Sequence, residues 1–121
     1  ERGLHIYSVF KIPYAERCFS LCGPENFLGL VQGADFVLSN SFHATAFSVI
    51  FEREFAVVER TEKINTRMRD FTAMLGLSDH MVTMETEIPG GTDWTAVRRC
   101  LKDEIDHAKA YIDEVLRDVE R

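Results

Sequence analysis

The sequence lacks any apolar run long enough to cross a membrane. A transmembrane helix needs about 20 consecutive, predominantly apolar residues, and no stretch of the 121 residues approaches that length. The sequence also has no basic, cleavable leader at Glu1. Because it begins without Met, we expect it to start inside a longer protein.

Positive charge is also scarce. Fourteen Lys and Arg residues stand against 20 Asp and Glu, which gives a formal net charge of −6. Surfaces that bind nucleic acid are normally basic, so no nucleic-acid partner is expected. Hydrophobic residues make up 45% of the sequence, which predicts a globular chain, and its length suits one domain or part of one.

Cysteine is rare and its spacing does not suit a metal site. Cys18 and Cys22 lack the second pair of ligands that a zinc site needs, and Cys100 leaves an odd number. The histidines also lack the spacing of metal ligands, as is seen for His5, His80 and His107. We therefore expect no metal and no cofactor, and we interpret the cysteines as reduced thiols of a cytoplasmic protein.

The stretch from Ala34 to Phe51 has the strongest pattern in the sequence. Asp35–Leu38 is a short apolar run typical of a buried strand, and small polar residues follow it. Phe42–Phe51 places large apolar residues among small ones, which predicts a helix pressed into a core. The turn between such a strand and helix leaves backbone N–H groups unpaired at a positive dipole end, which favours an anion.

His43 lies on the first turn of this predicted helix and is the first candidate for a functional residue. A structural interpretation stands beside the functional one. In it, Ser41 is only the helix N-cap, and His43 is a half-buried histidine bonded to a neighbouring carbonyl. The residues alone leave both interpretations open.

The elements around this stretch predict an α/β fold. Leu4–Phe10 and Phe55–Val58 have the composition of strands, and a helix is predicted from Pro24 to Gly33. The segment between Ile12 and Gly23 has no period and is expected to be an irregular connection. Alternating strands and helices predict a Rossmann-like parallel sheet with flanking helices, in which ligands bind beyond the carboxyl ends of the strands.

The second half of the sequence predicts mainly helices. A polar stretch after Glu59 leads into a helix that Gly76 closes, and His80–Met84 is a candidate for one more strand. After Pro89, a long helix is predicted over residues 92–121, with apolar residues at steps of three and four. Its length of roughly 40 Å exceeds one face of a small sheet, so part of it packs elsewhere or forms a coiled coil.

Two segments resemble a known family. Ser41-Phe42-His43, followed by a small residue and preceded by an apolar strand and a polar turn, resembles the signature of the polysaccharide pyruvyl transferase family. Ala44 stands where the family usually has Gly, and Asn40 stands where it tends to have Asp. The run RMRDFTAMLGL is similar to an Arg-containing segment of that family, in which Arg67 is the better match.

The resemblance implies an enzyme. It implies that residues 1–121 are a single C-terminal Rossmann-like domain of a two-domain, GT-B-like transferase, incomplete at its N-terminus and joined to a missing N-terminal domain. Such an enzyme moves the pyruvyl group of phosphoenolpyruvate onto a sugar of a surface polysaccharide, as a ketal. The resemblance implies His43 as the catalytic residue and three substrate-binding residues: Ser41, Phe42 and Arg67.

Two alternatives to this function remain. In the C-terminal domain of a nucleotide-sugar glycosyltransferase, the same turn would hold a diphosphate. In a non-catalytic interaction domain, the long helix would dock a partner and the turn would be packed over.

Overall fold

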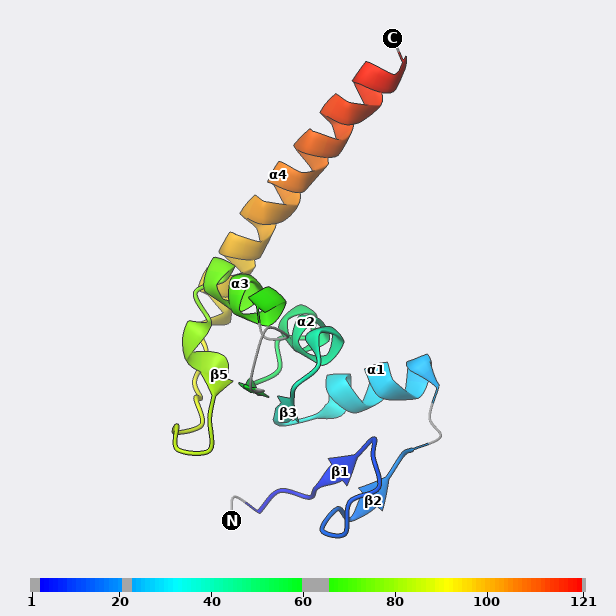
Figure 1. Ribbon diagram of the computed structural model, residues 1–121, viewed down its shortest axis with the longest axis vertical. Helices are drawn as coiled ribbons and strands as arrows, with labels where there is room; N and C mark the ends of the chain where they lie inside the picture. Colours follow the sequence, from blue (N-terminus) through cyan, green and yellow to red (C-terminus); the bar gives the residue numbers. More distant parts are fainter. Residues whose placement is uncertain (1–2, 21–22, 60–65, 121) are drawn as a thin grey trace. The chain divides into compact units, whose positions relative to one another are not determined.

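The computed structural model describes residues 3–20, 23–59 and 66–120 of the chain (Figure 1). It divides into two compact units, residues 1–58 and residues 59–121, and each is described by itself. Among the described residues, no helix is both long and apolar enough to cross a membrane. Cys22 and the first part of the polar stretch after Glu59, residues 60–65, lie outside the described residues. The prediction of a single domain over residues 1–121 stays a prediction.

The first unit begins with two short strands that form their own sheet. β1 (Tyr7–Ser8) and β2 (Arg17–Cys18) run parallel, and Figure 1 shows them side by side. Backbone hydrogen bonds extend the pairing at both ends, from Glu16 N–H to the carbonyl of Ile6 and from Phe19 N–H to that of Ser8, each 2.7 Å.

The prediction that Leu4–Phe10 shares a sheet with the other two strands is therefore wrong. The segment expected to be irregular supplies β2, and β2 takes up the hydrogen bonds of β1. The side chains of β2 hold the pair together, because the Arg17 guanidinium lies over the rings of Tyr7 and Phe19, 6.0 and 5.0 Å from their centroids. β1 is also shorter than the predicted strand.

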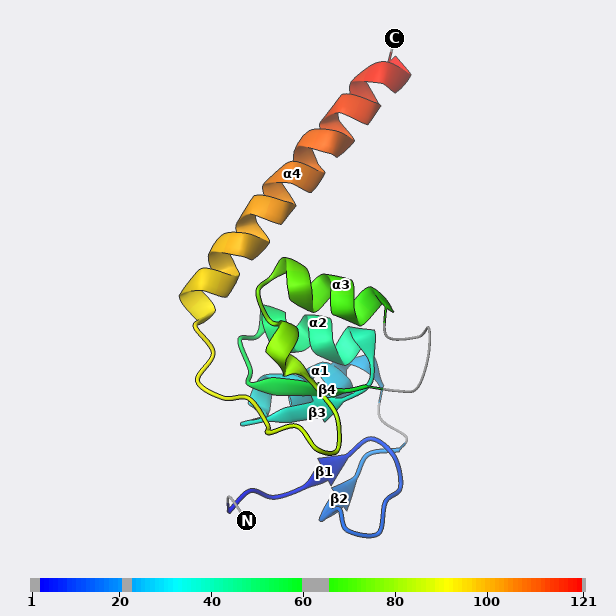
Figure 2. The same cartoon turned by 60° about the vertical axis from the view of Figure 1, so that its left-hand side comes forward.

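The rest of the first unit follows the predicted order of elements. It contains α1 (Pro24–Gly33), β3 (Val37–Ser39), α2 (Phe42–Ile50) and β4 (Phe55–Val58). β3 and β4 are parallel, with Val37 opposite Phe55 and Ser39 opposite Val57. Figure 2 shows α2 lying along these two strands. The expected α/β unit with parallel strands and flanking helices is thus confirmed.

β4 and α2 form the core of this unit. Phe55, Ala56 and Val57 are at most 1% exposed, and Val49 of α2 is 3% exposed. Edge-to-face packing of the Phe27 ring on the Phe47 ring, with centroids 6.4 Å apart, joins α1 to α2. This packing holds α2 against α1.

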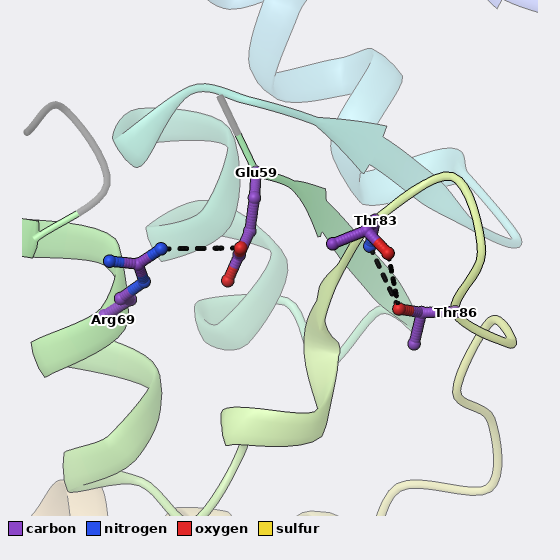
Figure 3. Close-up of polar contacts among 4 residues, drawn as sticks. All are labelled: Glu59, Arg69, Thr83 and Thr86. Atoms are coloured by element: carbon purple, nitrogen blue, oxygen red, sulfur yellow. Dashed lines mark hydrogen bonds and ion pairs between the residues drawn. The ribbon is translucent and has the colours of Figure 1, made fainter. Parts of the chain in front are cut away.

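In the second unit, α3 (Thr66–Met74) matches the predicted helix. Gly76 closes it with a φ of 71°, and Leu77 N–H bonds back to the carbonyl of Thr72 at 2.7 Å. A short 3-10 helix, η2 (Ser78–His80), and the strand β5 (Met81–Val82) follow. β5 is shorter than the predicted strand, because a turn begins at Thr83, whose hydroxyl lies 2.9 Å from that of Thr86 (Figure 3).

The long C-terminal helix is confirmed as α4 (Trp94–Glu120). Asp93 directly precedes the helix, and its carboxylate accepts a hydrogen bond from Ala96 N–H at 3.2 Å, as an N-cap side chain does. Val97 is buried at 3% exposure, whereas every residue from Lys102 to Glu120 is exposed.

Candidate functional site

The candidate site is the turn that joins the C-terminal end of β3 to the N-terminus of α2. The hydroxyl of Ser39, the last residue of β3, accepts a hydrogen bond from the backbone N–H of Ser41 at 2.9 Å. A serine that bonds a backbone N–H two residues ahead stabilises a tight turn. The turn therefore places Ser41 immediately before the first residue of the helix.

Ser41 is the N-cap of α2. Its backbone is extended (φ −102°, ψ 133°), and its Oγ accepts a hydrogen bond from Ala44 N–H at 3.4 Å. The hydroxyl of Thr45 donates to the carbonyl of Ser41 at 2.9 Å, and the hydroxyl of Ser48 donates to the carbonyl of Ala44 at 2.7 Å. The capping role that we considered for Ser41 is thus observed, and its role in binding a ligand stays a prediction.

Electrostatics at this helix start favour an anion. The first N–H groups of a helix lack acceptors within the helix, and the macrodipole places partial positive charge there. α2 has no acidic residue in its first turn, whereas α1 carries Glu25 in the equivalent place. The N-terminus of α2 therefore keeps a positive potential that no carboxylate of its own first turn offsets.

His43 and Phe42 occupy the first two positions of α2. His43 is exposed and Phe42 is half-buried, with the two rings 6.1 Å apart and nearly perpendicular. The interpretation of His43 as a half-buried histidine does not describe this geometry. The exposed imidazole belongs to the first turn of α2, the end of the helix at which the macrodipole favours an anion.

Ala44, which replaces the family's usual Gly, is only 4% exposed. Its methyl group therefore packs into the core of the first unit instead of covering the exposed side of the turn. The neighbouring residues Thr45 and Ser48 are buried as well, at 1% and 0% exposure. One side of the helix start is thus anchored, and His43 lies outside the anchored residues.

Arg67 lies in the second unit, on the first turn of α3, and its side chain is exposed. Arg69, two residues further, forms an ion pair with Glu59 at 3.4 Å, as Figure 3 shows. A ligand of Arg69 would have to compete with that carboxylate. Because the two units are described separately, Ser41, Phe42 and His43 are together at one turn, and the position of Arg67 relative to them stays a prediction.

Sequence reasoning missed the polar residues that hold the turn in place, namely Ser39, Thr45 and Ser48. The sequence does contain a signal for them. Thr45 and Ser48 each lie four residues, about one helical turn, after the residue that they bond, and Ser39 lies two residues before Ser41. Hydroxyls at such spacing can bond backbone carbonyls or N–H groups locally.

Among the described residues, no group of three His, Cys, Asp or Glu side chains is placed to hold a metal ion. Cys18 and Cys100 are free thiols, the first exposed and the second half-buried. His80 is buried at 3% exposure, with its Nε2 3.4 Å from the Thr92 hydroxyl, an environment that suits a structural histidine.

Comparison with known proteins bears on this turn directly. The family model described as polysaccharide pyruvyl transferase matches residues 16–62 of the 121-residue chain. Searches of curated proteins and of solved structures gave no match. The matched residues include β3, the turn and α2, whereas Arg67 lies outside them. The resemblance indicated by Ser41-Phe42-His43 is therefore confirmed: over residues 16–62 this chain is similar to the polysaccharide pyruvyl transferase family.

Proposed function

We propose that this chain forms the donor-binding part of a polysaccharide pyruvyl transferase that takes phosphoenolpyruvate as its donor. In this proposal it acts as a Rossmann-like, C-terminal domain of a two-domain, GT-B-like enzyme in the cytoplasm. The acceptor is a sugar of a surface polysaccharide. The observation that carries the proposal is the position of exposed His43 on the first turn of α2, inside the residues that match the family.

The chemistry of the donor suits this turn. Phosphoenolpyruvate carries a phosphate and a carboxylate, so its site needs N–H donors and cationic groups. The start of α2 provides N–H groups and positive dipole without an acid in its first turn. Ser41 keeps the helix start fixed through its hydrogen bond with Ala44 N–H, so these donors are oriented before the donor binds.

Formation of a ketal from phosphoenolpyruvate defines what the protein has to do. Two sugar hydroxyls form two C–O bonds to C2 of the donor, and the bond from C2 to the phosphate oxygen breaks. One hydroxyl proton ends on C3, and the other leaves with inorganic phosphate. His43 is assigned to this exchange, either as the group that holds the leaving phosphate or as the acid or base that moves a proton.

Phe42 and Arg67 have supporting roles in the proposal. Phe42, half-buried beside the His43 ring, would pack against the donor and fix the direction of the imidazole. The Arg67 guanidinium, exposed on α3, matches a carboxylate or a phosphate in a two-pronged hydrogen bond. In the proposal, this guanidinium binds one of the two anionic groups of the donor.

The proposal can be tested on the 121-residue chain by following backbone amide signals in ¹H–¹⁵N NMR spectra during titration. Phosphoenolpyruvate should shift the signals of Phe42, His43 and Ala44 along a saturating curve. The start of α1 is an internal control, because it is also a helix N-terminus but carries Glu25. Its amide signals should move little.

The choice of ligands separates the alternatives. A uridine diphosphate titration that saturates at the same signals, with phosphoenolpyruvate leaving them unchanged, would favour the glycosyltransferase. If neither ligand moves them up to tens of millimolar, the turn does not bind the donor and the proposal is contradicted. Inorganic phosphate tested alone shows how much of the response comes from the phosphate group.

A further inference from the structure

The C-terminal part of α4 carries an apolar stripe with a heptad repeat. If Ile105 is placed at heptad position a, then Ile112 and Val119 also fall at a, and the d positions hold Leu101, Ala108 and Val115. A stripe with this period faces one direction along a helix. It spans nearly three heptads without a charged residue at a or d.

All residues of this stripe except the half-buried Leu101 are exposed in the structure. Ile105, Ile112, Val115 and Val119 have exposures of 43%, 54%, 41% and 76%. In both views, α4 extends beyond α3 of the same unit (Figures 1 and 2). In proteins, most of the stability of a helix comes from the packing of its apolar face, so an apolar partner along the stripe would stabilise this part of α4.

We propose that the stripe pairs with the same stripe of a second copy of this chain, in a parallel two-stranded coiled coil. The a residues are compatible with this arrangement, because β-branched residues at a, combined with Leu at d as at Leu101, favour two strands in parallel coiled coils. All three a residues named above, Ile105, Ile112 and Val119, are β-branched.

The charges that flank the stripe support a parallel second copy. In a parallel dimer, a residue at g lies next to the e residue five positions later on the partner helix. Glu104 at g thus lies next to Lys109 at e of the other copy. The twofold symmetry of the dimer produces a second, identical pair, from Lys109 of the first copy to Glu104 of the other. Tyr111 at g meets Leu116 at e in the same way, and both are exposed in the single chain, at 66% and 54%.

The remaining charges of α4 agree with this choice of partner. Lys102 bonds within its own helix to Asp106 at 2.7 Å, and this hydrogen bond raises the pKa of Lys102 and lowers the pKa of Asp106. In an antiparallel pair, the e residues of one helix would face the e residues of the other, and the g residues would face the g residues. The lysines at e would then lie together, and so would the acids at g.

The composition of α4 also disfavours an anionic lipid surface as the partner, because the helix has seven acidic and five basic residues.

The molar mass of the 121-residue chain in solution tests the proposal, measured by sedimentation equilibrium from about 1 to 200 μM. We expect a monomer–dimer equilibrium within this range. Ile112→Asp should raise the dissociation constant at least a hundredfold. Ala110→Asp is the matched control, because Ala110 lies at heptad position f and is exposed, and it should change the constant less than threefold.

Charge reversal tests the parallel orientation. Glu104→Lys alone and Lys109→Glu alone should each weaken the dimer about tenfold, and the double reversal in one chain should restore it. Asp103→Lys, at position f, controls for the change in net charge. Circular dichroism should show the same folded helix content for Ala110→Asp and the wild type.

Three results would overturn the proposal. The first is a monomer at every concentration, which would assign the stripe to another part of a longer polypeptide. The second is a dimer that tolerates Ile112→Asp, which would place the interface elsewhere. The third is a dimer in which the double reversal is no tighter than the single reversals, which contradicts the parallel pairing.

Discussion

The hydroxyl of Thr45 donates a hydrogen bond of 2.9 Å to the carbonyl oxygen of Ser41, one helical turn earlier. Thr45 is 1% exposed, so this bond is protected from water and ties the helix start to the core of the first unit. The opposite side of the same turn carries exposed His43. A rigid helix start with an exposed ionisable side chain is the arrangement that an anion-binding turn needs.

Ser41→Ala should destabilise the first unit by about 1 kcal/mol, the usual cost of losing a serine N-cap. The hydroxyl that caps Ala44 N–H at 3.4 Å is then absent. Urea unfolding at constant pH measures the loss. Ser41→Thr is the control, because it keeps the capping hydroxyl and should retain most of the stability. Equal stability of Ser41→Ala and the wild type would contradict the capping role.

Phe55→Ala should be much more costly, by about 3–5 kcal/mol, because it opens a cavity in the core. Phe55 is 1% exposed in β4. The matched control is Phe10→Ala, since Phe10 is 75% exposed and its loss should change stability by less than about 0.5 kcal/mol. Thermal and urea unfolding of the two variants side by side should separate them clearly, and similar losses would mean that β4 is not the core strand.

The sequence predicted the part of the fold that depends on local patterns. Phe55–Val58 is observed with the predicted bounds, and α2 starts at Phe42 as predicted. Both segments combine a strong apolar pattern with clear polar boundaries. Gly76 marked the end of α3 correctly, because the chain there adopts a positive φ that glycine permits.

The pairing of β1 with β2 could not be predicted in the same way. Parallel strands normally need a crossover of a dozen or more residues, and the connection from Val9 to Glu16 is shorter than that. The pair depends on tertiary contacts that no period reveals. They are the stacking of Arg17 on two rings and the hydrogen bond between His5 Nδ1 and the Glu16 carboxylate at 2.7 Å.

The strand, the polar turn and the helix that carry the candidate site were predicted from local patterns, and so was the position of His43 on the first turn of α2. The binding roles of Ser41 and Phe42 were inferred from the family resemblance and stay predictions. Ser39 was missed as a contributor, because its role is a side-chain bond to a backbone N–H. The position of Arg67 relative to the turn depends on how two units meet, and local patterns carry no information about that.

We expect the 121-residue chain alone to show no pyruvyl transfer from phosphoenolpyruvate. In two-domain transferases the reacting groups meet between the domains, and their proximity can be worth roughly 7 to 11 kcal/mol of the barrier. A coupled assay for released phosphate in the presence of acceptor saccharide measures the rate. Turnover by the chain alone would show that catalysis needs no second domain.

Arg67→Ala, made in a full-length enzyme that contains this chain, should weaken donor binding about 10- to 100-fold, the usual cost of losing a charged hydrogen bond. The loss should appear in KM for phosphoenolpyruvate more than in kcat. Arg69→Ala is the matched control, because Arg69 is an exposed arginine two residues further along the same helix, where its side chain points in a different direction from that of Arg67, and it should change KM only a few-fold. If Arg67→Ala also changes KM only a few-fold, Arg67 belongs to a solvated rim.

The most direct measurement of the central claim is the turnover of His43→Ala in the same full-length enzyme, at saturating phosphoenolpyruvate, together with its melting temperature. Because His43 is exposed, its removal should leave the melting temperature within a few degrees of the wild type. Loss of acid–base help should lower kcat by roughly a hundred- to ten-thousandfold. His107→Ala, an exposed histidine on α4, should change neither quantity. A His43→Ala enzyme that keeps its rate within a few-fold while its melting temperature falls would contradict the assignment of the site.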